Sequence, residues 1–422
     1  MLDTSPMSVG KRYTIANRAT KYDLSMQFNP MHTLRKLRNV KWKVTHLQYI
    51  VITASMIYSV CIIQEPGFWV KTLVAVALTV ALLLPLTSQF FFPAISILAW
   101  LFLFYGCKFI PVSVRPHIWV RVLPALENIL YGSNISSLLS STTHSVLDVI
   151  AWLPYGVIHY GAPFIVSFVL FVFAPPGTLP VWARSFGYMN LIGVLIQIFF
   201  PCSPPWYENI HGLSAANYGM HGSPGGLARI DALFGTSTYT STFTNSPLVF
   251  GAFPSLHAAC AMLEALFLAH TFPRVRFVFY GYVLWLCWCT MYLTHHYFVD
   301  LVGGCVLALA CYLFAEKLYL PQLQPGKVLR WEYDTIVRGS SGHTAEKAFA
   351  VDAETERERN VVEFVEEMDA LEMADLDREW SIGSSAPNSV IETPIRMRSP
   401  PAHPSTQPPI TVESAKMTAA KA

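Results

Sequence analysis

Residues 251–257 read GAFPSLH, and residues 295–300 read HHYFVD. The residues between these two stretches are apolar and numerous enough to cross a bilayer twice, since one crossing takes about 20 residues. The two stretches therefore return to the same membrane surface. This places His257, His296 and Asp300 together at that surface, which suggests a shared site.

These three polar groups are of the kinds that a phosphoryl-transfer site requires. Ionisable side chains at membrane depth are costly unless they pair or face water, so they are candidates for function. His296 and Asp300 are four residues apart, which would put both on one helical face and let the carboxylate fix the imidazole tautomer. His296 would then be the nucleophile or base, and His257 the complementary acid. A lone interfacial histidine is more often a surface residue, but three such groups at these spacings favour a site.

The composition indicates a polytopic membrane protein rather than two or three soluble domains. Of the 422 residues, 53% are hydrophobic and only 13% are charged, and the mean hydropathy is +0.39. Such values are typical of chains with several membrane spans. The eight cysteines form no CxxC pair, so a structural zinc site is not expected. We expect neither a metal ion nor another cofactor.

The apolar runs predict an all-α polytopic membrane protein, a helical bundle of six to eight transmembrane helices. The second and third runs are separated only by the region around Pro85 and Pro93, which predicts a tight hairpin. The eight candidate spans are 46–64, 68–87, 89–106, 157–175, 184–202, 255–272, 276–295 and 299–318.

The distribution of charge predicts the orientation and the domains. Nine lysines and arginines precede the first span, which places the N-terminus in the cytoplasm. After an even number of spans the C-terminus is also cytoplasmic, whereas the loops 107–156 and 203–254 share the opposite face with the histidines. The loop 203–254 is either a lid or substrate-binding loop, or a loop that packs on the membrane surface. The predicted domains are a basic N-terminus (1–45), a membrane-embedded catalytic domain (46–320) and a largely disordered tail (321–422).

The motifs resemble those of a known superfamily. PSLH at 254–257 and the spacing of His296 and Asp300 resemble the second and third motifs of the type 2 phosphatidic acid phosphatases. FPSLH, HHYFVD and the PPWY of 204–207 are closer still to the fungal inositol phosphorylceramide synthases, over roughly residues 45–320. The resemblance implies a catalytic core of that phosphatase type, with His257, His296 and Asp300 as the catalytic triad.

The resemblance also implies a reaction and a location. Phosphoinositol would pass from phosphatidylinositol to the ceramide hydroxyl, with release of diacylglycerol, as a step of sphingolipid biosynthesis. The enzyme would lie in the Golgi membrane with a luminal active site, and a small regulatory membrane subunit is a possible partner. The sequence leaves two routes open. Either His296 attacks phosphorus and forms a covalent intermediate, or His296 with Asp300 deprotonates the ceramide hydroxyl for a direct transfer.

Two positions depart from the superfamily pattern. Leu256 replaces a usual glycine, and Thr290 replaces a usual arginine six residues before the histidine. An arginine fork suits a doubly charged phosphate monoester, whereas a diester carries a single charge, so the departures favour a diester transferase. Four residues are predicted as substrate ligands. They are Lys108 and Arg115, which fit the superfamily's first motif, together with Arg229 and Ser255.

Other functions fit the sequence less well. A lipid phosphate phosphatase and a phosphocholine-type sphingolipid synthase belong to the same superfamily and are the main alternatives. A non-catalytic transporter would have ionisable residues spread through the middle of several spans. Here they gather at one face, and the span interiors hold few, with Glu264 the main exception.

Overall fold

The computed structural model describes residues 24–333, which form helices joined by loops, with isolated β-bridges and no strand. The predicted tail begins at residue 321, so the structure describes its first part, and its part from 334 onward lies outside the described range. Residues 1–23 of the basic N-terminus also lie outside it. Each of the eight predicted apolar runs contains a helix, which confirms the all-α class. The helices of the N-terminal half are α1 (Pro30–Arg38), α2 (Leu47–Ile62), α3 (Phe68–Leu83), α4 (Pro85–Phe91), α5 (Ile95–Gly106), α6 (Val122–Tyr131), α7 (Ile135–Ser140), α8 (Ser145–Trp152) and α9 (His159–Phe173).

The second half of the chain alternates long helices with a helical loop region. The π-helical turn η4 (Leu153–Ile158) joins α8 to α9, so that residues 145–173 are one continuous helical rod. The remaining helices are α10 (Thr178–Phe199), α11 (Pro205–His211), α12 (Leu227–Phe234), α13 (Thr238–Thr244), α14 (Leu256–Thr271), α15 (Arg276–Tyr292) and α16 (Phe298–Leu318).

The predicted hairpin around Pro85 and Pro93 has a different form. Pro85 is the first residue of α4, where its fixed φ suits a helix start, and the preceding Leu84 has an extended backbone. The axes of α3 and α4 are bent by 106° as a result. The short helix α4, which runs roughly perpendicular to α3, therefore lies where the sequence predicts a tight hairpin.

Three helices of the described part are long and apolar enough to cross a membrane: Ser145–Phe173, Thr178–Phe199 and Phe298–Leu318. The bent pair α3 and α4 would be a fourth if it is one broken span. The helices α2, α5 and α14 are apolar but shorter. Large hydrophobic side chains such as Leu73 (68% exposed) and Phe164 (78%) lie on the outer surface, as expected of a lipid-facing surface. The chain is a polytopic membrane protein, and the count of six to eight spans stays a prediction.

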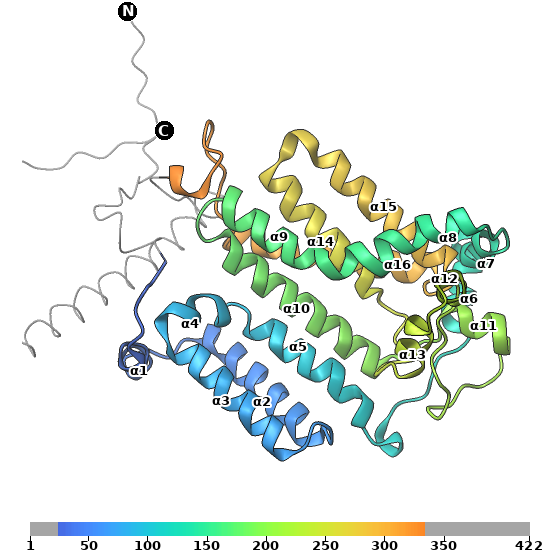
Figure 1. The fold of residues 1–422 in the computed structure, drawn as a ribbon, viewed down its shortest axis with the longest axis horizontal. Helices are drawn as coiled ribbons and strands as arrows, with labels where there is room; N and C mark the ends of the chain where they lie inside the picture. The colour runs from blue at the N-terminus through green and yellow to red at the C-terminus, as the bar shows by residue number, and fades with distance from the viewer. Residues whose placement is uncertain (1–23, 334–422) are drawn as a thin grey trace, which may run out of the picture. The chain divides into compact units, whose positions relative to one another are not determined.

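The core of the bundle lies where α9, α10, α14 and α16 meet. α10 packs against α5, α14 and α16, while α14 packs against α15, α16 and α9 (Figure 1). Large side chains such as Trp182, Phe267 and Met189 fill the space between these helices and are almost completely buried. This packing fixes the starting points of α14 and α16, which carry the sequence motifs.

The short helices gather at one end of the bundle. α7 and α8 contact α15, α6 contacts α16, and α12 contacts both α8 and α13. Figure 1 shows these elements together with α11 where α15 ends and α16 begins. The two long loops of the sequence therefore meet at the end of the bundle that carries the histidines.

The close approach of α14 and α16 depends on Gly304. A Cβ at this position would collide with the Ser255 carbonyl oxygen and lie 3.2 Å from the Ala259 amide nitrogen. We expect Gly304→Ala to lower the stability of the detergent-solubilised protein by about 1–3 kcal/mol, the usual cost of overpacking. Thermal unfolding followed by size-exclusion chromatography measures this. Gly281→Ala in α15 is the matched control, because no atom lies within 4 Å of its added Cβ. Equal melting temperatures for the two variants would contradict the prediction.

Candidate active site

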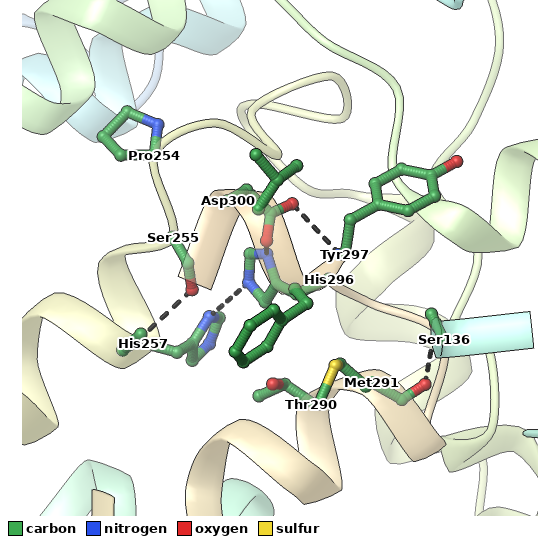
Figure 2. Close-up of polar contacts among 12 residues, drawn as sticks. Ser136, Pro254, Ser255, His257, Thr290, Met291, His296, Tyr297 and Asp300 are labelled. Carbon is green, nitrogen blue, oxygen red and sulfur yellow. Dashed lines mark hydrogen bonds and ion pairs between the residues drawn. The ribbon is translucent and has the colours of Figure 1, made fainter. Parts of the chain in front are cut away.

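The site lies where the start of α14 meets the turn that leads into α16. Ser255 is the N-cap of α14, and its hydroxyl accepts a hydrogen bond from the Ala258 amide at 3.3 Å. The backbone of Ser255 also donates to the Asp300 carbonyl at 3.0 Å, which ties the two helix starts together. Figure 2 shows the His257 and His296 rings pointing toward one another, with Asp300 beside His296. The structure thus brings all three predicted catalytic residues into one place.

The backbone that carries His296 is a turn rather than a helix. α15 ends at Tyr292 and α16 begins at Phe298, with Tyr297 as its N-cap. Within the turn, Thr294 adopts a left-handed backbone conformation with φ of 63°. The prediction that His296 and Asp300 lie on one face of a helix is therefore wrong, because His296 lies before the helix begins. The two side chains nevertheless lie close together. The turn swings His296 back over the first turn of α16, where Asp300 lies.

The distances describe a resting arrangement of the two histidines. His257 Nδ1 lies 3.1 Å from His296 Nε2, and His296 Nδ1 lies 3.4 Å from Asp300 Oδ1. Asp300 is fully buried, and its other oxygen accepts from the Tyr297 amide at 3.2 Å. The facing nitrogens are within hydrogen-bond reach, so no phosphorus atom fits between them. A substrate that reacts in line between an attacking His296 and a protonating His257 must first separate the two rings.

Three chain segments hold the approach to α14. Cys202 forms parallel bridges with both Trp119 and Gly251, so residues of the two long loops lie side by side. From the bundle core, the Gln197 side chain donates to the Pro254 carbonyl at 2.9 Å. These bonds fix the backbone that enters α14, and through it the position of His257.

The loop 203–254 is anchored on the turn that carries His296. The Trp206 amide donates to the Thr294 carbonyl, and the Gly226 amide donates to the Leu293 carbonyl, both at 2.9 Å. A ring nitrogen of His295 lies 3.0 Å from the Pro224 carbonyl oxygen. The ring of His295 therefore contacts the loop.

Two glutamates, of which Glu127 is fully buried, support the turn, and sequence reasoning missed both. Glu127 of α6 is fully buried and accepts from the Phe298 amide at 3.2 Å and the Val299 amide at 3.1 Å. It satisfies two of the free N–H groups at the start of α16, where the helix dipole favours a negative charge. Glu208 of α11 accepts from the Tyr297 hydroxyl at 2.9 Å and from the Asn134 side chain at 2.9 Å.

A second pair of residues beside His257 was also missed. The ring of His159, the first residue of α9, lies 4.8 Å from that of His257 between centroids. The Tyr155 ring, within the π-helical turn η4, lies 4.6 Å from the His257 ring and stacks on His295 at 5.3 Å. His159 falls inside a predicted span, so the presence of an ionisable side chain there could have marked it as a candidate.

Comparison with known proteins assigns the chain to a family. The PAP2 superfamily profile matches residues 121–314, a stretch that contains all three predicted catalytic residues. The inositol phosphorylceramide synthase catalytic subunit of Schizosaccharomyces pombe is 62% identical over 386 residues, which cover 89% of this chain and 92% of that protein. The chain belongs to the inositol phosphorylceramide synthase family.

Two further members of the family are similar over most of their length. The inositol phosphorylceramide synthase of Candida albicans is 47% identical over 334 residues, covering 78% of this chain and 71% of that protein. The catalytic subunit of the Saccharomyces cerevisiae synthase is 48% identical over 316 residues, covering 74% of this chain and 78% of that protein. The resemblance inferred from the motifs is thereby confirmed.

Lys108 and Arg115 fit the first superfamily motif, but they do not join the triad. Both line a cavity of about 500 Å³, and none of the three triad residues lines it. The Arg115 guanidinium donates to the Ile110 carbonyl at 3.0 Å and the Cys107 carbonyl at 2.9 Å, and it lies over the Tyr218 ring. The PAP2 superfamily match also begins only after Arg115. Arg115 thus braces its own loop.

Arg229 and Ser255, the other two predicted substrate ligands, also have structural partners. Arg229 forms an ion pair with Asp148 of α8 at 2.7 Å, and Asp148 accepts from the Tyr292 hydroxyl at 2.9 Å. Burial opposes the charge of Arg229, but the hydrogen bond and ion pair with Asp148 prevail and raise its pKa. The Ser255 hydroxyl serves as the helix cap described above. Among residues 24–333, no group of three His, Cys, Asp or Glu side chains is placed to hold a metal ion.

Proposed function

We propose that the chain is the catalytic subunit of an inositol phosphorylceramide synthase. It transfers phosphoinositol from phosphatidylinositol to the ceramide hydroxyl and releases diacylglycerol. The observation that carries the proposal is the contact of His257 with His296 at 3.1 Å, with Asp300 behind His296, in a chain 62% identical to a named synthase. The contact supplies the chemistry, and the relatives supply the substrate class.

Three residues suffice for a two-step transfer. In the first step, His296 Nε2 attacks phosphorus, the bond from phosphorus to the diacylglycerol oxygen breaks, and His257 gives that oxygen a proton. In the second step, His257 takes the proton of the ceramide hydroxyl, whose oxygen attacks phosphorus and displaces His296. Asp300 holds Nδ1 of His296 and stabilises the positive charge that the ring gains. A single-step route, in which His296 with Asp300 deprotonates ceramide, uses the same residues.

The surroundings of Thr290 favour a diester substrate over a phosphate monoester. Thr290 stands where the phosphatases carry an arginine, and its fully buried hydroxyl donates to the Cys287 carbonyl at 2.9 Å. It offers no positive charge to a doubly charged phosphate. A phosphatidylinositol diester carries one charge and needs less compensation.

The proposal includes a setting in the cell. The synthase lies in the Golgi membrane with both termini in the cytoplasm and the triad on the luminal side. The support is the basic N-terminal segment together with the gathering of both long loops at the end of the bundle that carries the triad. A small regulatory membrane subunit is part of the same proposal.

A panel of phospholipid donors tests the proposed function. The purified full chain is mixed with labelled ceramide and with vesicles that contain phosphatidylinositol, phosphatidylcholine or phosphatidic acid. We expect a labelled product, inositol phosphorylceramide, from phosphatidylinositol only. The absence of an arginine at position 290 favours a diester over phosphatidic acid, and the similar proteins are named as inositol phosphorylceramide synthases. Product analysis by thin-layer chromatography and mass spectrometry measures this.

Two results of the panel would overturn the proposal. Release of inorganic phosphate from phosphatidic acid as the dominant reaction would identify a lipid phosphate phosphatase. A phosphocholine product made from phosphatidylcholine would identify the other type of sphingolipid synthase.

A further inference from the structure

Each cationic side chain predicted from the sequence has a position or a partner other than the triad. Lys108 and Arg115 line the separate cavity, and Arg229 is paired with Asp148. Thr290 replaces the arginine of the third motif. A phosphodiester that reacts at His296 still develops charge on its free oxygens, and a placed hydrogen-bond donor there lowers the barrier. A side chain beside the triad can supply this donor.

His159 lies in position to do so. Its ring packs against that of His257 at 4.8 Å between centroids. The ring is only partly buried, while its Nδ1 atom is buried and has no hydrogen-bond partner. A buried ring nitrogen without a partner is costly, and it is often explained by a group that binds there.

The local backbone aims His159 at the site. The π-helical turn η4 adds a residue to the rod between α8 and α9, which changes the direction in which the following side chains point. Its Tyr155 is nearly fully buried and packs against both His257 and His295. These contacts fix the position of the turn relative to His257 and His295. They thereby fix His159, the residue after the turn, beside His257.

We propose that His159 is a further catalytic residue, whose ring N–H donates to a free oxygen of the phosphodiester in place of the arginine absent at Thr290. The proposal rests on the proposed function. A neutral imidazole always carries one N–H, so the donation needs no additional charge. A single donor of this kind suits a diester with one negative charge, whereas a guanidinium fork would favour a monoester.

The test compares a variant without a donor with variants that keep one. His159→Phe keeps the aromatic packing against His257 and Tyr155 but cannot donate, while His159→Gln and His159→Asn keep an N–H donor and lose the aromatic ring. Steady-state transfer from phosphatidylinositol to ceramide is measured for the full chain. His117→Phe is the matched control, because His117 is an exposed histidine of a loop.

We expect His159→Phe to lower kcat and kcat/KM together by about 10²- to 10³-fold, the usual effect of losing one such donor. At least one of the amide variants should regain tenfold or more over His159→Phe. A role in packing alone gives the opposite order, with His159→Phe near wild type and the amides impaired, and would overturn the inference. If the wild-type protein is active and His159→Phe is equally active, only the inference about His159 is overturned. If the wild-type protein is inactive with phosphatidylinositol, the proposed function is overturned as well.

Discussion

Replacing His296 with alanine is expected to abolish phosphoinositol transfer, on the order of 10⁴-fold or more, because either route needs its ring nitrogen as nucleophile or base. His257→Ala should lower transfer by about 10²- to 10⁴-fold, the usual worth of a general acid. Asp300→Asn should give a loss of about 10⁴-fold, because an amide can hold the ring in the wrong tautomer. Transfer of labelled phosphoinositol to ceramide by the purified variants measures all three.

A matched control separates catalysis from folding. His270 is a histidine at the far end of α14, where a ring nitrogen lies 3.2 Å from the Pro321 carbonyl oxygen. His270→Gln keeps a donor for that carbonyl and should transfer at close to the wild-type rate. Size-exclusion profiles show whether each variant remains folded. Wild-type activity in a well-folded His257, His296 or Asp300 variant would contradict the role given to that residue.

Sequence patterns predicted the helices and the meeting of the triad because both depend on local spacing. Apolar runs of about 20 residues specify helices whatever their neighbours. The distance along the chain between His257 and His296 matches two crossings, which returns both residues to one end of the bundle. The turn of residues 293–297 differs from the prediction. The spacing of His296 and Asp300 predicts a helix there, whereas Thr294 takes a left-handed conformation that no residue pattern in the stretch indicates.

The supporting residues of the site could not be predicted because their partners are far away in the sequence. Glu127 bonds to amides about 170 residues later, and nothing in α6 marks it as a helix cap for α16. Lys108 and Arg115, in contrast, match a short motif in the sequence but do not lie with the triad in the structure. The spacing fits, but both residues line a cavity that no triad residue lines. Three fixed positions in a sequence carry little spatial information.

Glu127→Gln is expected to disturb the start of α16 and, through it, the triad. Three backbone amides, of Ile135, Phe298 and Val299, donate to this buried carboxylate. An amide side chain turns an N–H group toward some of these donors, and each lost bond to a charged acceptor costs about 1.5–3 kcal/mol. The start of α16 then shifts, and Asp300 shifts with it. We expect kcat to fall by about tenfold or more while KM changes little, because the carboxylate touches no substrate.

Kinetics and stability of the same samples decide whether Glu127 acts in this way. Glu65→Gln is the control, because Glu65 is an exposed carboxylate far along the chain from the turn. Glu127→Asp keeps the charge with a shorter reach, and it should recover part of the lost kcat if the negative charge at the start of α16 is what matters. A Glu127→Gln variant with wild-type kcat would show that α16 holds Asp300 without this cap. A variant that loses stability while kcat per folded molecule is unchanged would limit Glu127 to a role in folding.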